Sequence, residues 1–473
     1  MKTKTVEYNH EYSKIESDGT VKIIEKKYTI NIEPLKNKLG VMLVGMGGNN
    51  GTTFLSGILA YKNNICWNNK YGTHKVQFLG SISQFGSVHI GYDVNQKPHS
   101  KLFRDISDMH EPQNIVVGGW DICGDNMYEA AKKAHVLDYD LLEKLKHDLE
   151  IIQPLPSIYN PDFIATNQKI RANNIIKNNY LETIKYDIEK FKIENSLERV
   201  VVLWTASTER FHNGKWKNRN DLYNAIKDND PEVSPSILFA TAAAETGSIF
   251  LNGSPQNTIC PAVIDNAKFF KTFVGGEDFK TGQTKLKSVL VDWLASSGIK
   301  PLSIVSYNHL GNNDGKNLDE ERQFRSKELT KKNVIDDVVD ENPNIFSSGK
   351  PDHAVVIKYV PAVGDSKRAM DEYYSELFLN GKHTLAIHNT CEDSLLAVPL
   401  MLDIVLFSEL FSRITLNDEN FDTVLSVLSL FFKAPIVKDT EPLINSFFKQ
   451  KNGLENFFRI LSGIPPNNHL YFL

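Results

Sequence analysis

The chain has 473 residues, of which 41% are hydrophobic and 23% charged, a composition typical of a globular protein with two domains or with one large domain that carries an insertion. A formal net charge of -5 gives no general attraction to nucleic acid or to an anionic membrane, so we expect neither as a partner, and any phosphate site must be local. The four cysteines are scattered without a C-x-x-C pair, which argues against a disulfide framework and a zinc site. We expect reduced, buried thiols, and no residue pattern identifies a bound metal.

The N-terminal region is polar and lacks the apolar run of a signal peptide. The longest apolar region, residues 395–411, contains Pro399, Asp403 and Glu409, which predicts a buried helix rather than a membrane span. A soluble, cytoplasmic protein without a membrane partner is therefore expected.

Apolar, β-branched runs in the first part of the chain predict strands that alternate with helices. The predicted strands lie at residues 41–45, 76–83, 114–119 and 199–207. Helical patterns lie at residues 52–62, 165–198 and 220–235. Continuously apolar strands separated by helices indicate a parallel sheet covered on both faces. This part of the chain is therefore predicted to have an α/β fold with a doubly wound sheet.

The first predicted strand runs into a glycine-rich loop, GMGGNNG, and then into a helix. Glycines let a backbone approach a pyrophosphate, and the N–H groups at a helix start favour negative charge. The spacing departs from G-x-G-x-x-G, because Asn50 stands where the third glycine is expected and Gly51 follows it. The loop predicts a dinucleotide site, with a tight turn that holds no ligand as the alternative.

A dinucleotide site usually has an acidic residue for the adenosine ribose at the end of the second strand. The predicted strand at residues 76–83 ends in Ser83, and Gln84 follows it. The next strand, however, leads into Asp121, which is placed to reach a ribose hydroxyl. The alternative role for Asp121 is that of a helix N-cap.

After Thr284 the pattern changes to a mixture of helices and strands with its own sheet. A helix that stops near Gly298 and a strand into an Asn/Gly-rich loop come first, within residues 285–311. Two more strands are predicted at residues 353–360 and 383–389, with a helix at residues 368–379 between them. From Asp393 the pattern is helical again, and this segment is expected to return to the first domain.

Two polar segments, one just before this region and one within it, are candidates for binding a phosphate or a polyol. Residues 275–287 place Asp278 among glycines before a helix, and residues 306–315 place Asn308, Asn313 and Asp314 after a strand. Amides and carboxylates at the end of a strand suit sugar hydroxyls. Well-capped surface turns have the same composition and are the alternative.

Lysines in the same half are candidates for acid–base chemistry. Lys327 and Lys331 have the i, i+4 spacing of one helix face, and burial of that face over a cleft lowers the pKa of one of them. A solvated face is the alternative. Lys367 lies in a later polar segment, and Lys433 stands between a Phe-Phe pair and Ala-Pro, where a simple surface charge is not expected.

The chain resembles the myo-inositol-1-phosphate synthase family across roughly residues 39–470. The resemblance rests on motifs in the family's order: GMGGNNGTT, VVGGWD, VVLWTASTER, NGSPQNT, GGEDFKTGQTKLKS, SYNHLGNNDG, QFRSKE, VGDSKRAMDEYYSEL and HNTCEDSLLA. It implies an N-terminal arm and a Rossmann-like NAD-binding domain in residues 1–285, and an inserted α+β catalytic and tetramerisation domain in residues 286–394. It also implies a C-terminal segment, residues 395–473, that returns to the NAD-binding domain, and a homotetramer.

The activity implied by the resemblance is the NAD-dependent isomerisation of D-glucose 6-phosphate to 1L-myo-inositol 1-phosphate, the first step of inositol biosynthesis. C5 is oxidised, C6 enolises and attacks the C1 aldehyde, and C5 is reduced again, so that NAD is recycled. An NAD-dependent sugar-phosphate dehydrogenase and a non-catalytic NAD-binding scaffold are the alternatives.

The resemblance also implies a role for particular residues. Contacts with NAD are implied at Gly45, Gly47, Gly48, Asn49, Asn50, Asp121, Arg171, Thr205 and Ala206. Catalytic roles are implied for Lys327, Lys331, Lys367, Lys433, Asp278, Asp314, Asp393, Asn308 and Asn313.

In this scheme Lys327 removes the O5 proton, the other three lysines stabilise oxyanions and hold the phosphate, and Asp314 and Asp393 orient the lysines. Lys358 competes with Lys367 for its role. The chain departs from the family pattern at Met46 and Ser207, which bears on NAD affinity.

Overall fold

The computed structural model describes residues 3–36, 38–168, 179–438 and 441–469. A six-stranded sheet lies at the centre of one half of the molecule, and all its neighbouring strands are parallel. In spatial order its strands are β12 (Val274–Gly275), β11 (Ile249–Asn252), β10 (Arg199–Trp204), β3 (Leu39–Val44), β8 (Ile115–Asp121) and β9 (Leu155–Pro156). The predicted parallel sheet is thereby confirmed.

Helices cover both faces of this sheet. One face carries α1 (Asn49–Lys62), α3 (Met127–Ala134) and α14 (Asp393–Ser412), and the other carries α6 (Tyr180–Asn195), α8 (Pro235–Glu245) and α9 (Pro261–Phe269). Alternate residues of β3 enter the two cores: Val41 and Leu43 the first, Met42 and Val44 the second. A strand buried on both faces has no polar side, which is why its sequence is an unbroken apolar run.

The apolar helix predicted at residues 395–411 is confirmed as α14. Within the described part of the chain it is the one helix long and apolar enough to cross a membrane, but 89% of that stretch is buried inside the protein. Its side chains pack between α1 and the six-stranded sheet, so the apolar composition serves the core of the first domain.

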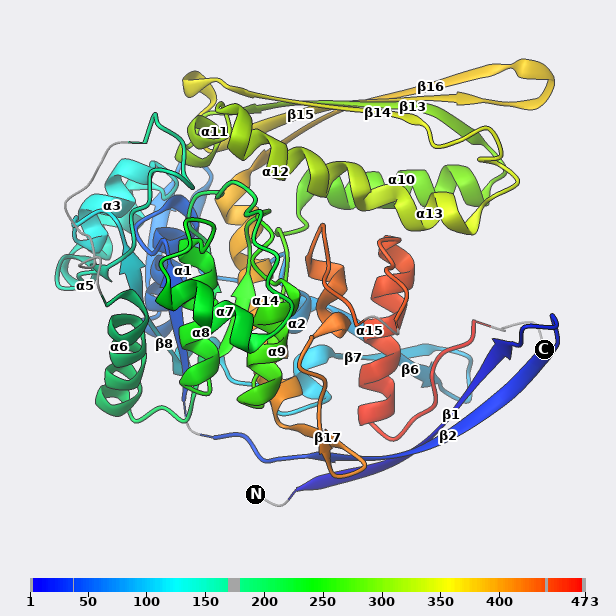
Figure 1. The fold of residues 1–473 in the computed structure, drawn as a ribbon, viewed down its shortest axis with the longest axis horizontal. Coiled ribbons are helices and arrows are strands. Elements are labelled where there is room, and N and C mark those ends of the chain that lie inside the picture. Colours follow the sequence, from blue (N-terminus) through cyan, green and yellow to red (C-terminus); the bar gives the residue numbers. More distant parts are fainter. Residues whose placement is uncertain (1–2, 37, 169–178, 439–440, 470–473) are drawn as a thin grey trace.

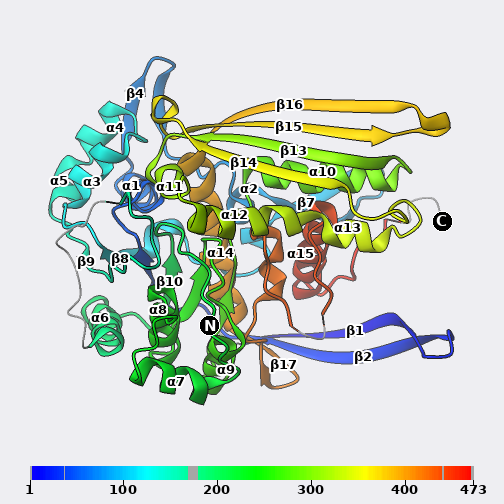
Figure 2. The same cartoon turned by 45° about the horizontal axis from the view of Figure 1, so that its top comes forward.

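A second, four-stranded sheet forms the other half of the molecule. Its spatial order is β14 (Asp352–Tyr359), β13 (Lys300–Leu310), β15 (Ser366–Glu376) and β16 (Lys382–Glu392). Figures 1 and 2 show one face lined by α10 (Gly282–Ser296), α12 (Glu321–Lys332) and α13 (Asp336–Glu341), whereas the opposite face is open. The prediction of a separate sheet with helices is therefore confirmed.

An N-terminal hairpin leaves the body on the same side as the free end of the second sheet (Figure 1). It consists of β1 (Lys4–Ile15) and β2 (Val21–Ile32), and the end of β2 also pairs antiparallel with β17 (Ile414–Leu416). The remaining helices and strands are α2 (Ile82–Phe85), α4 (Tyr139–Lys144), α5 (Lys146–Glu150), α7 (Arg219–Lys227), α11 (Asn313–Asn317), α15 (Phe447–Leu461), β4 (Cys66–Asn69), β5 (Gly72–Lys75), β6 (Ser87–Tyr92), β7 (Pro98–Leu102) and β18 (Glu419–Asn420). Short 3-10 helices are η1 (Phe103–Asp105), η2 (Pro112–Asn114), η3 (Asn333–Ile335), η4 (Pro361–Val363), η5 (Phe378–Asn380) and η6 (Ser426–Phe431).

The helix predicted over residues 368–379 is wrong, because this segment forms β15. Ala369 and Asp371 are buried, whereas Met370 and Glu372 are exposed, which is the two-residue period of a strand. Its charged and helix-favouring residues concealed that period, and antiparallel pairing with β13 and β16 overrides the local preference.

The strand predicted over residues 76–83 is also wrong, because its end forms the start of α2. Asp403 of α14 accepts hydrogen bonds from the Ser81 hydroxyl and from the next two backbone N–H groups. A buried carboxylate, and not a neighbouring strand, therefore satisfies this backbone. Consequently β8, and not a strand of residues 76–83, lies beside β3 on the side opposite β10.

Other predictions are confirmed in part. The helical pattern over residues 165–198 becomes α6 in its second portion, whereas residues 169–178, including Arg171, lie outside the described residues. Cys66 is exposed and the other three cysteines are half-buried, so the expectation of buried thiols is wrong.

Candidate active site

The loop between β3 and α1 requires glycine at two positions. Gly45 has a φ of +89°, and a Cβ atom there would lie 2.6 Å from the Cα atom of Ala206. A Cβ atom on Gly51 would lie 2.3 Å from the carbonyl oxygen of Met46. The glycine after Asn50 therefore permits the first turn of the helix to approach the loop, which explains the departure from the usual spacing.

The start of α1 is suited to an anion. Its N-cap residue, Gly48, makes no side-chain capping hydrogen bond, and the first turn contains no acidic residue. Backbone N–H groups at an uncapped helix start carry partial positive charge. Gly48, Asn49 and Asn50 all line a cavity, so this charge is available to a bound phosphate.

Asp121 holds the glycine loop in place. Its carboxylate accepts hydrogen bonds from the N–H groups of Gly47 at 2.8 Å and Cys123 at 2.7 Å. It does not cap the following helix, because Asn126 caps α3, so that alternative is wrong. Asp121 ends the strand beside β3 and lines the cavity, and its contact with a ribose stays a prediction.

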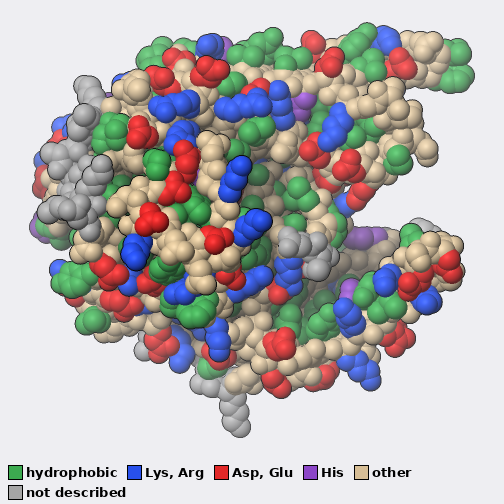
Figure 3. All heavy atoms as spheres, viewed as in Figure 1, with side chains coloured by type: hydrophobic (Ala, Val, Ile, Leu, Met, Phe, Trp, Pro, Cys, Tyr) green, Lys and Arg blue, Asp and Glu red, His purple; other side chains and the backbone are tan. Residues whose placement is uncertain are grey.

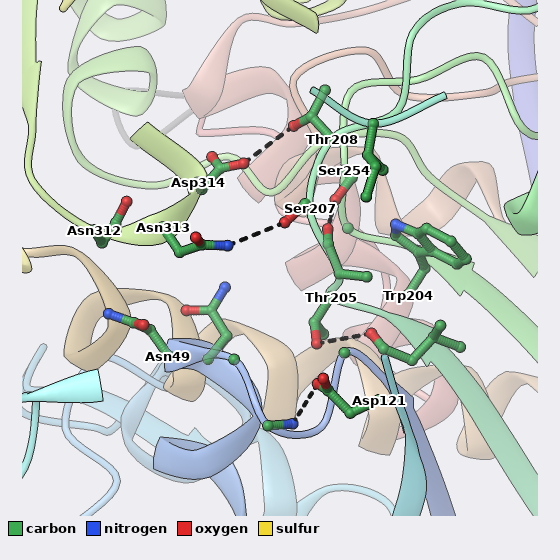
Figure 4. Close-up of a pocket in the computed structure, with 18 of the residues that line it drawn as sticks. Asn49, Asp121, Trp204, Thr205, Ser207, Thr208, Ser254, Asn312, Asn313 and Asp314 are labelled. Carbon is green, nitrogen blue, oxygen red and sulfur yellow. Dashed lines mark hydrogen bonds between the residues drawn. The ribbon is translucent and has the colours of Figure 1, made fainter. Parts of the chain in front are cut away.

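One cavity extends from the glycine loop to the second sheet and contains most of the predicted site. Its lining includes Gly45, Gly47, Gly48, Asn49, Asn50, Asp121, Thr205, Ala206, Asp278, Asn313, Asp314, Lys327, Lys367, Asp393 and Lys433. Figure 4 shows Asn313 and Asp314 facing Ser207 and Thr208, with Asn49 and Asp121 below them in the view. Met46 is buried in the first core and is not among the lining residues, whereas Ser207 is.

Asp278 joins two of the lysines. It is 1% exposed, and its Oδ1 atom accepts hydrogen bonds from Lys327 Nζ at 2.7 Å and from Lys433 Nζ at 3.0 Å. Thr330 donates to the other carboxylate oxygen at 2.9 Å. Burial alone would raise the pKa of Asp278, but the two ammonium groups outweigh it and lower the pKa to about 2. The carboxylate is therefore ionised at neutral pH.

The two lysines that share this carboxylate differ in their environment. Burial lowers the pKa of Lys433, and repulsion from Lys327 and Lys367 adds to this effect, against the attraction of Asp278. Burial also acts on Lys327, but Asp278 and Asp314 outweigh it and raise its pKa. Because Asp314 supports Lys327 in addition to the shared Asp278, Lys433 is the member of the pair that more readily loses a proton.

The remaining charged residues surround this pair. Lys367 Nζ lies 3.5 Å from Asp393 Oδ1, and the neighbouring lysines outweigh burial and lower the pKa of Asp393. Burial raises the pKa of Asp314, which accepts a hydrogen bond from Thr208 at 3.3 Å. Lys358 is exposed on β14 and is not among the lining residues, so Lys367 is the lysine that reaches the cavity.

Comparison with known proteins identifies the family of the chain. An NAD-binding family model described as myo-inositol-1-phosphate synthase matches residues 39–459. The chain belongs to the myo-inositol-1-phosphate synthase family. Over 480 residues it is 47% identical to inositol-3-phosphate synthase of Dictyostelium discoideum, covering 98% of this chain and 94% of that protein. It is 48% identical to inositol-3-phosphate synthase 1 of Oryza sativa subsp. japonica, covering 92% of this chain and 87% of that protein.

A solved structure in the same family has the same fold. The crystal structure of inositol-3-phosphate synthase from Caenorhabditis elegans is 46% identical and superposes with a TM-score of 0.95. The match covers 99% of this chain and 94% of that chain. The Rossmann-like fold expected for a member of the family is thereby confirmed.

Asp365 is a residue of this family member that the sequence analysis missed. Its carboxylate accepts hydrogen bonds from Asn49 at 3.1 Å, from Asn312 at 3.4 Å, and from the N–H and hydroxyl of Ser394 at 2.8 and 2.9 Å. It therefore connects the glycine loop with the second sheet and with the start of α14. Its position two residues before Lys367 was the available signal.

Asn308 and Lys331 lie outside the cavity lining but contact each other. Lys331 Nζ donates to Asn308 Oδ1 at 2.9 Å and to Gln283 Oε1 at 3.0 Å. Burial, together with the surrounding lysines, lowers the pKa of Lys331. Within the described ranges, no three His, Cys, Asp or Glu side chains are grouped as a metal site.

Proposed function

We propose that this protein converts D-glucose 6-phosphate into 1L-myo-inositol 1-phosphate, the compound also named as the 1D-3-phosphate. The observation that carries the proposal is one cavity whose lining includes the glycine loop as well as Lys327, Lys367 and Lys433. A phosphorylated sugar placed there has cations for its phosphate and for developing oxyanions. The relatives named above are inositol-3-phosphate synthases, which supports the same activity here.

NAD is the proposed cofactor, and the residues of the glycine loop fit it. A side chain at Gly45 would meet Ala206, and a side chain at Gly47 would meet Asp121. Glycine therefore keeps the loop close to its neighbours and open to a pyrophosphate. Asn49, Asn50, Thr205 and the implied Arg171 would supply further contacts. When bound, NAD supplies the oxidation of C5 and its later reduction, so that the net reaction is an isomerisation.

We assign removal of the C5 hydroxyl proton to Lys433, in place of the assignment to Lys327. Lys433 has the lowered pKa of the pair and thus the available neutral amine. Lys327 keeps its proton against Asp278 and can stabilise negative charge on the same oxygen. One carboxylate oxygen of Asp278 accepts hydrogen bonds from the Nζ atoms of both lysines. The proposed base, Lys433, and the proposed cation, Lys327, therefore lie beside each other.

The later steps also build negative charge on oxygen, at the C6 enolate and at C1 during ring closure. Lys367 is oriented by Asp393 and lines the cavity, so it is proposed to stabilise one of these oxyanions. Lys331, held by Asn308 and Gln283, is proposed to gain its full charge when the substrate phosphate arrives. Asn313 and Asp314 are proposed to bind substrate hydroxyls.

Glucose 6-phosphate with substoichiometric NAD tests the proposal against its alternatives. We expect many turnovers per NAD, a non-reducing phosphate ester as product, and no accumulation of NADH. Net NADH would indicate a sugar-phosphate dehydrogenase, and binding without turnover would indicate a scaffold. Either of these results rejects the proposed isomerisation.

We also propose a homotetramer. Tyr307 and Met370, on the open face of the second sheet, are 47% and 37% exposed, and Phe378 and Leu379 at its free end are 88% and 83% exposed. Figure 3 shows the two projecting arms with a recess between them and apolar side chains at the end of the upper arm. Apolar surface of this kind is expected to be covered by other copies of the chain.

The proposed domain division follows the family. The second sheet lies within the proposed inserted domain of residues 286–394, and side chains of α14 and α15 belong to the first core, as proposed for residues 395–473. Residues 1–285 then hold the N-terminal arm and the NAD-binding domain. A cytoplasmic location is part of the same proposal.

A further inference from the structure

A second cluster of buried charged side chains lies on the covered face of the four-stranded sheet, and none of its members is among the cavity-lining residues. Lys287 of α10 and Asp371 of β15 are 2% and 3% exposed. Lys287 Nζ donates to Ser306 Oγ and contacts His353 Nε2, both at 2.8 Å. Ser306 in turn donates to Asp371 Oδ1, so the lysine and the carboxylate are joined through one hydroxyl.

Gln283 connects this cluster to Lys331. Its Nε2 atom donates to Asp371 Oδ1 at 3.0 Å, and its Oε1 atom accepts from Lys331 Nζ at 3.0 Å. A side-chain amide has one donor end and one acceptor end. The reverse orientation would place donors against Lys331 and an acceptor against Asp371, so the Asp371 oxygen, which accepts hydrogen bonds here, selects the observed orientation.

We propose that Asp371 and Lys287 are positioning residues for Lys331: Asp371 fixes the Gln283 amide so that its oxygen faces Lys331, and Lys287 holds the Ser306 hydroxyl that donates to Asp371. This inference rests on the proposed function, in which Lys331 gains its full charge when the substrate phosphate arrives. It adds a role for two residues that lie outside the cavity lining.

The charges around Asp371 agree with this role. The titratable groups on the elements packed against it are Lys287 from α10, Lys331 from α12, His353 from β14 and Tyr373 on its own strand. Burial, with repulsion from Lys287, lowers the pKa of His353 to about 3, so its ring is neutral and accepts the hydrogen bond from Lys287. Burial lowers the pKa of Lys287 to about 8 against the attraction of Asp371, so it is still largely a cation at pH 7.

The first arm of the test compares two substitutions of Asp371. Asp371→Asn keeps an acceptor for Gln283, whereas Asp371→Leu removes it and frees the amide to turn. In the Leu variant we expect kcat/KM for glucose 6-phosphate to fall by about tenfold or more, because one hydrogen bond to a charged group is lost. In the Asn variant we expect a fall of less than about threefold, because the acceptor is kept. NAD affinity should not change in either. Asp352→Asn, an exposed acid at the start of β14, is the matched control and should behave as the unchanged protein.

The second arm tests Lys287 and stays informative if the Asp371→Leu variant does not fold. Lys287→Met removes the donor to Ser306 Oγ, so that the hydroxyl is free to turn away from Asp371. We expect kcat/KM to fall by about threefold or more, and Lys287→Arg to restore it. Because Lys287 is proposed to act only through Asp371, Lys287→Met should cause no further fall in kcat/KM in the Asp371→Leu protein.

Equal kcat/KM for the Leu and Asn variants of Asp371 overturns the proposal, as does a kcat/KM that Lys287→Met leaves unchanged. Failure of the proposed function is distinguishable, because the unchanged protein would then form no inositol phosphate. In that case the same variants are compared by calorimetric binding of glucitol 6-phosphate with NAD present, since this ligand has no C1 aldehyde and cannot cyclise. The orientation of Gln283 then predicts the same order of affinities, with the Asn variant close to the unchanged protein and the Leu variant weaker.

Discussion

Lys327 and Lys433 donate to the same oxygen of Asp278, so removal of either lysine changes the charge on the other. In Lys327→Ala, Asp278 serves Lys433 alone, and the pKa of Lys433 rises. The variant therefore loses one cation and also the neutral amine that we assign as the base. We expect kcat to fall by about a thousandfold or more, the combined loss of general-base catalysis and of charge stabilisation.

Steady-state turnover and calorimetric NAD binding measure this prediction together. NAD affinity should remain within about threefold of the unchanged protein, because Lys327 contacts Asp278 and not the glycine loop. Lys332→Ala on the same helix is the control, since Lys332 pairs with Glu328 and should be dispensable. An equal loss of NAD binding and turnover in Lys327→Ala would show that the assigned role is wrong.

Glu277 makes the stability of the protein depend on pH. It is 5% exposed, and burial raises its pKa to about 8 although Ile259 N–H donates to it at 2.7 Å. Because the folded-state pKa lies above the unfolded-state value of 4.5, the folded protein holds a proton that the unfolded chain releases. The contribution of Glu277 to stability is thus greatest below the unfolded-state pKa and is lost as pH rises toward the folded-state pKa.

Glu277→Gln tests this dependence, because glutamine cannot ionise. Its free energy of unfolding relative to the unchanged protein should rise by a few kcal/mol between about pH 5 and pH 8. Urea unfolding at several pH values across this window measures the difference. A difference that does not vary with pH would mean that Glu277 is ionised in the folded protein.

The sequence identified most of the candidate site, but not the pairings within it. Lys433 was recognisable because its neighbours are apolar, whereas its partner Asp278 lies 155 residues earlier and follows only from the tertiary structure. Asp365 and Asp371 stand in polar segments, where a carboxylate resembles a surface residue. Their burial depends on a strand that the local pattern did not predict.

At the scale of elements, the junction between β3 and α1 is the most constrained. In Gly51→Ala the new Cβ meets the Met46 carbonyl oxygen, so the loop or the first turn of α1 must shift. We expect a loss of about 2 kcal/mol in the free energy of unfolding and NAD affinity at least about tenfold weaker.

Gly57→Ala is the matched control on the same helix. The nearest atom to a Cβ atom there is in Phe78 at 3.9 Å, so no atom has to move. This variant should be unchanged or more stable by up to about 1 kcal/mol, because alanine favours a helix. Thermal unfolding and NAD titration compare the two variants, and equal behaviour would contradict the assigned close approach.

Elements were predictable where local pattern and tertiary position agree. The apolar runs of β3, β8 and β10 were sufficient to predict these strands, whereas the shorter β9, β11 and β12 of the same sheet were not predicted. The long apolar run of α14 was recognisable as a buried helix because polar residues interrupt it. The pattern failed for β15, which alternates charged residues on both sheet faces, and for residues 76–83, whose backbone is satisfied by Asp403 from α14. In both cases a partner distant in the chain decides the conformation.

At the scale of the whole molecule, the open face of the second sheet carries the prediction of assembly. Met370→Glu places a charge in the centre of the proposed contact, and we expect the tetramer to dissociate into smaller species with little change in the fold. Light scattering measures the mass. Tyr186→Glu, at a 65% exposed site on α6, is the control. An unchanged mass for Met370→Glu would place the contact elsewhere.

The charged cluster around Asp278 also determines how much of the chain must be synthesised before the candidate site is complete. Asp278 needs Lys433 across 155 residues, and β12 is bridged at Val274 by Val424. Contacts of such large sequence separation form late in folding. A nascent chain therefore exposes an unfinished sheet edge and an uncompensated Asp278 until the segment around Lys433 has left the ribosome. We therefore expect a chain that stops before Lys433 to lack both this contact and the partner of β12, and to be inactive rather than a weaker enzyme.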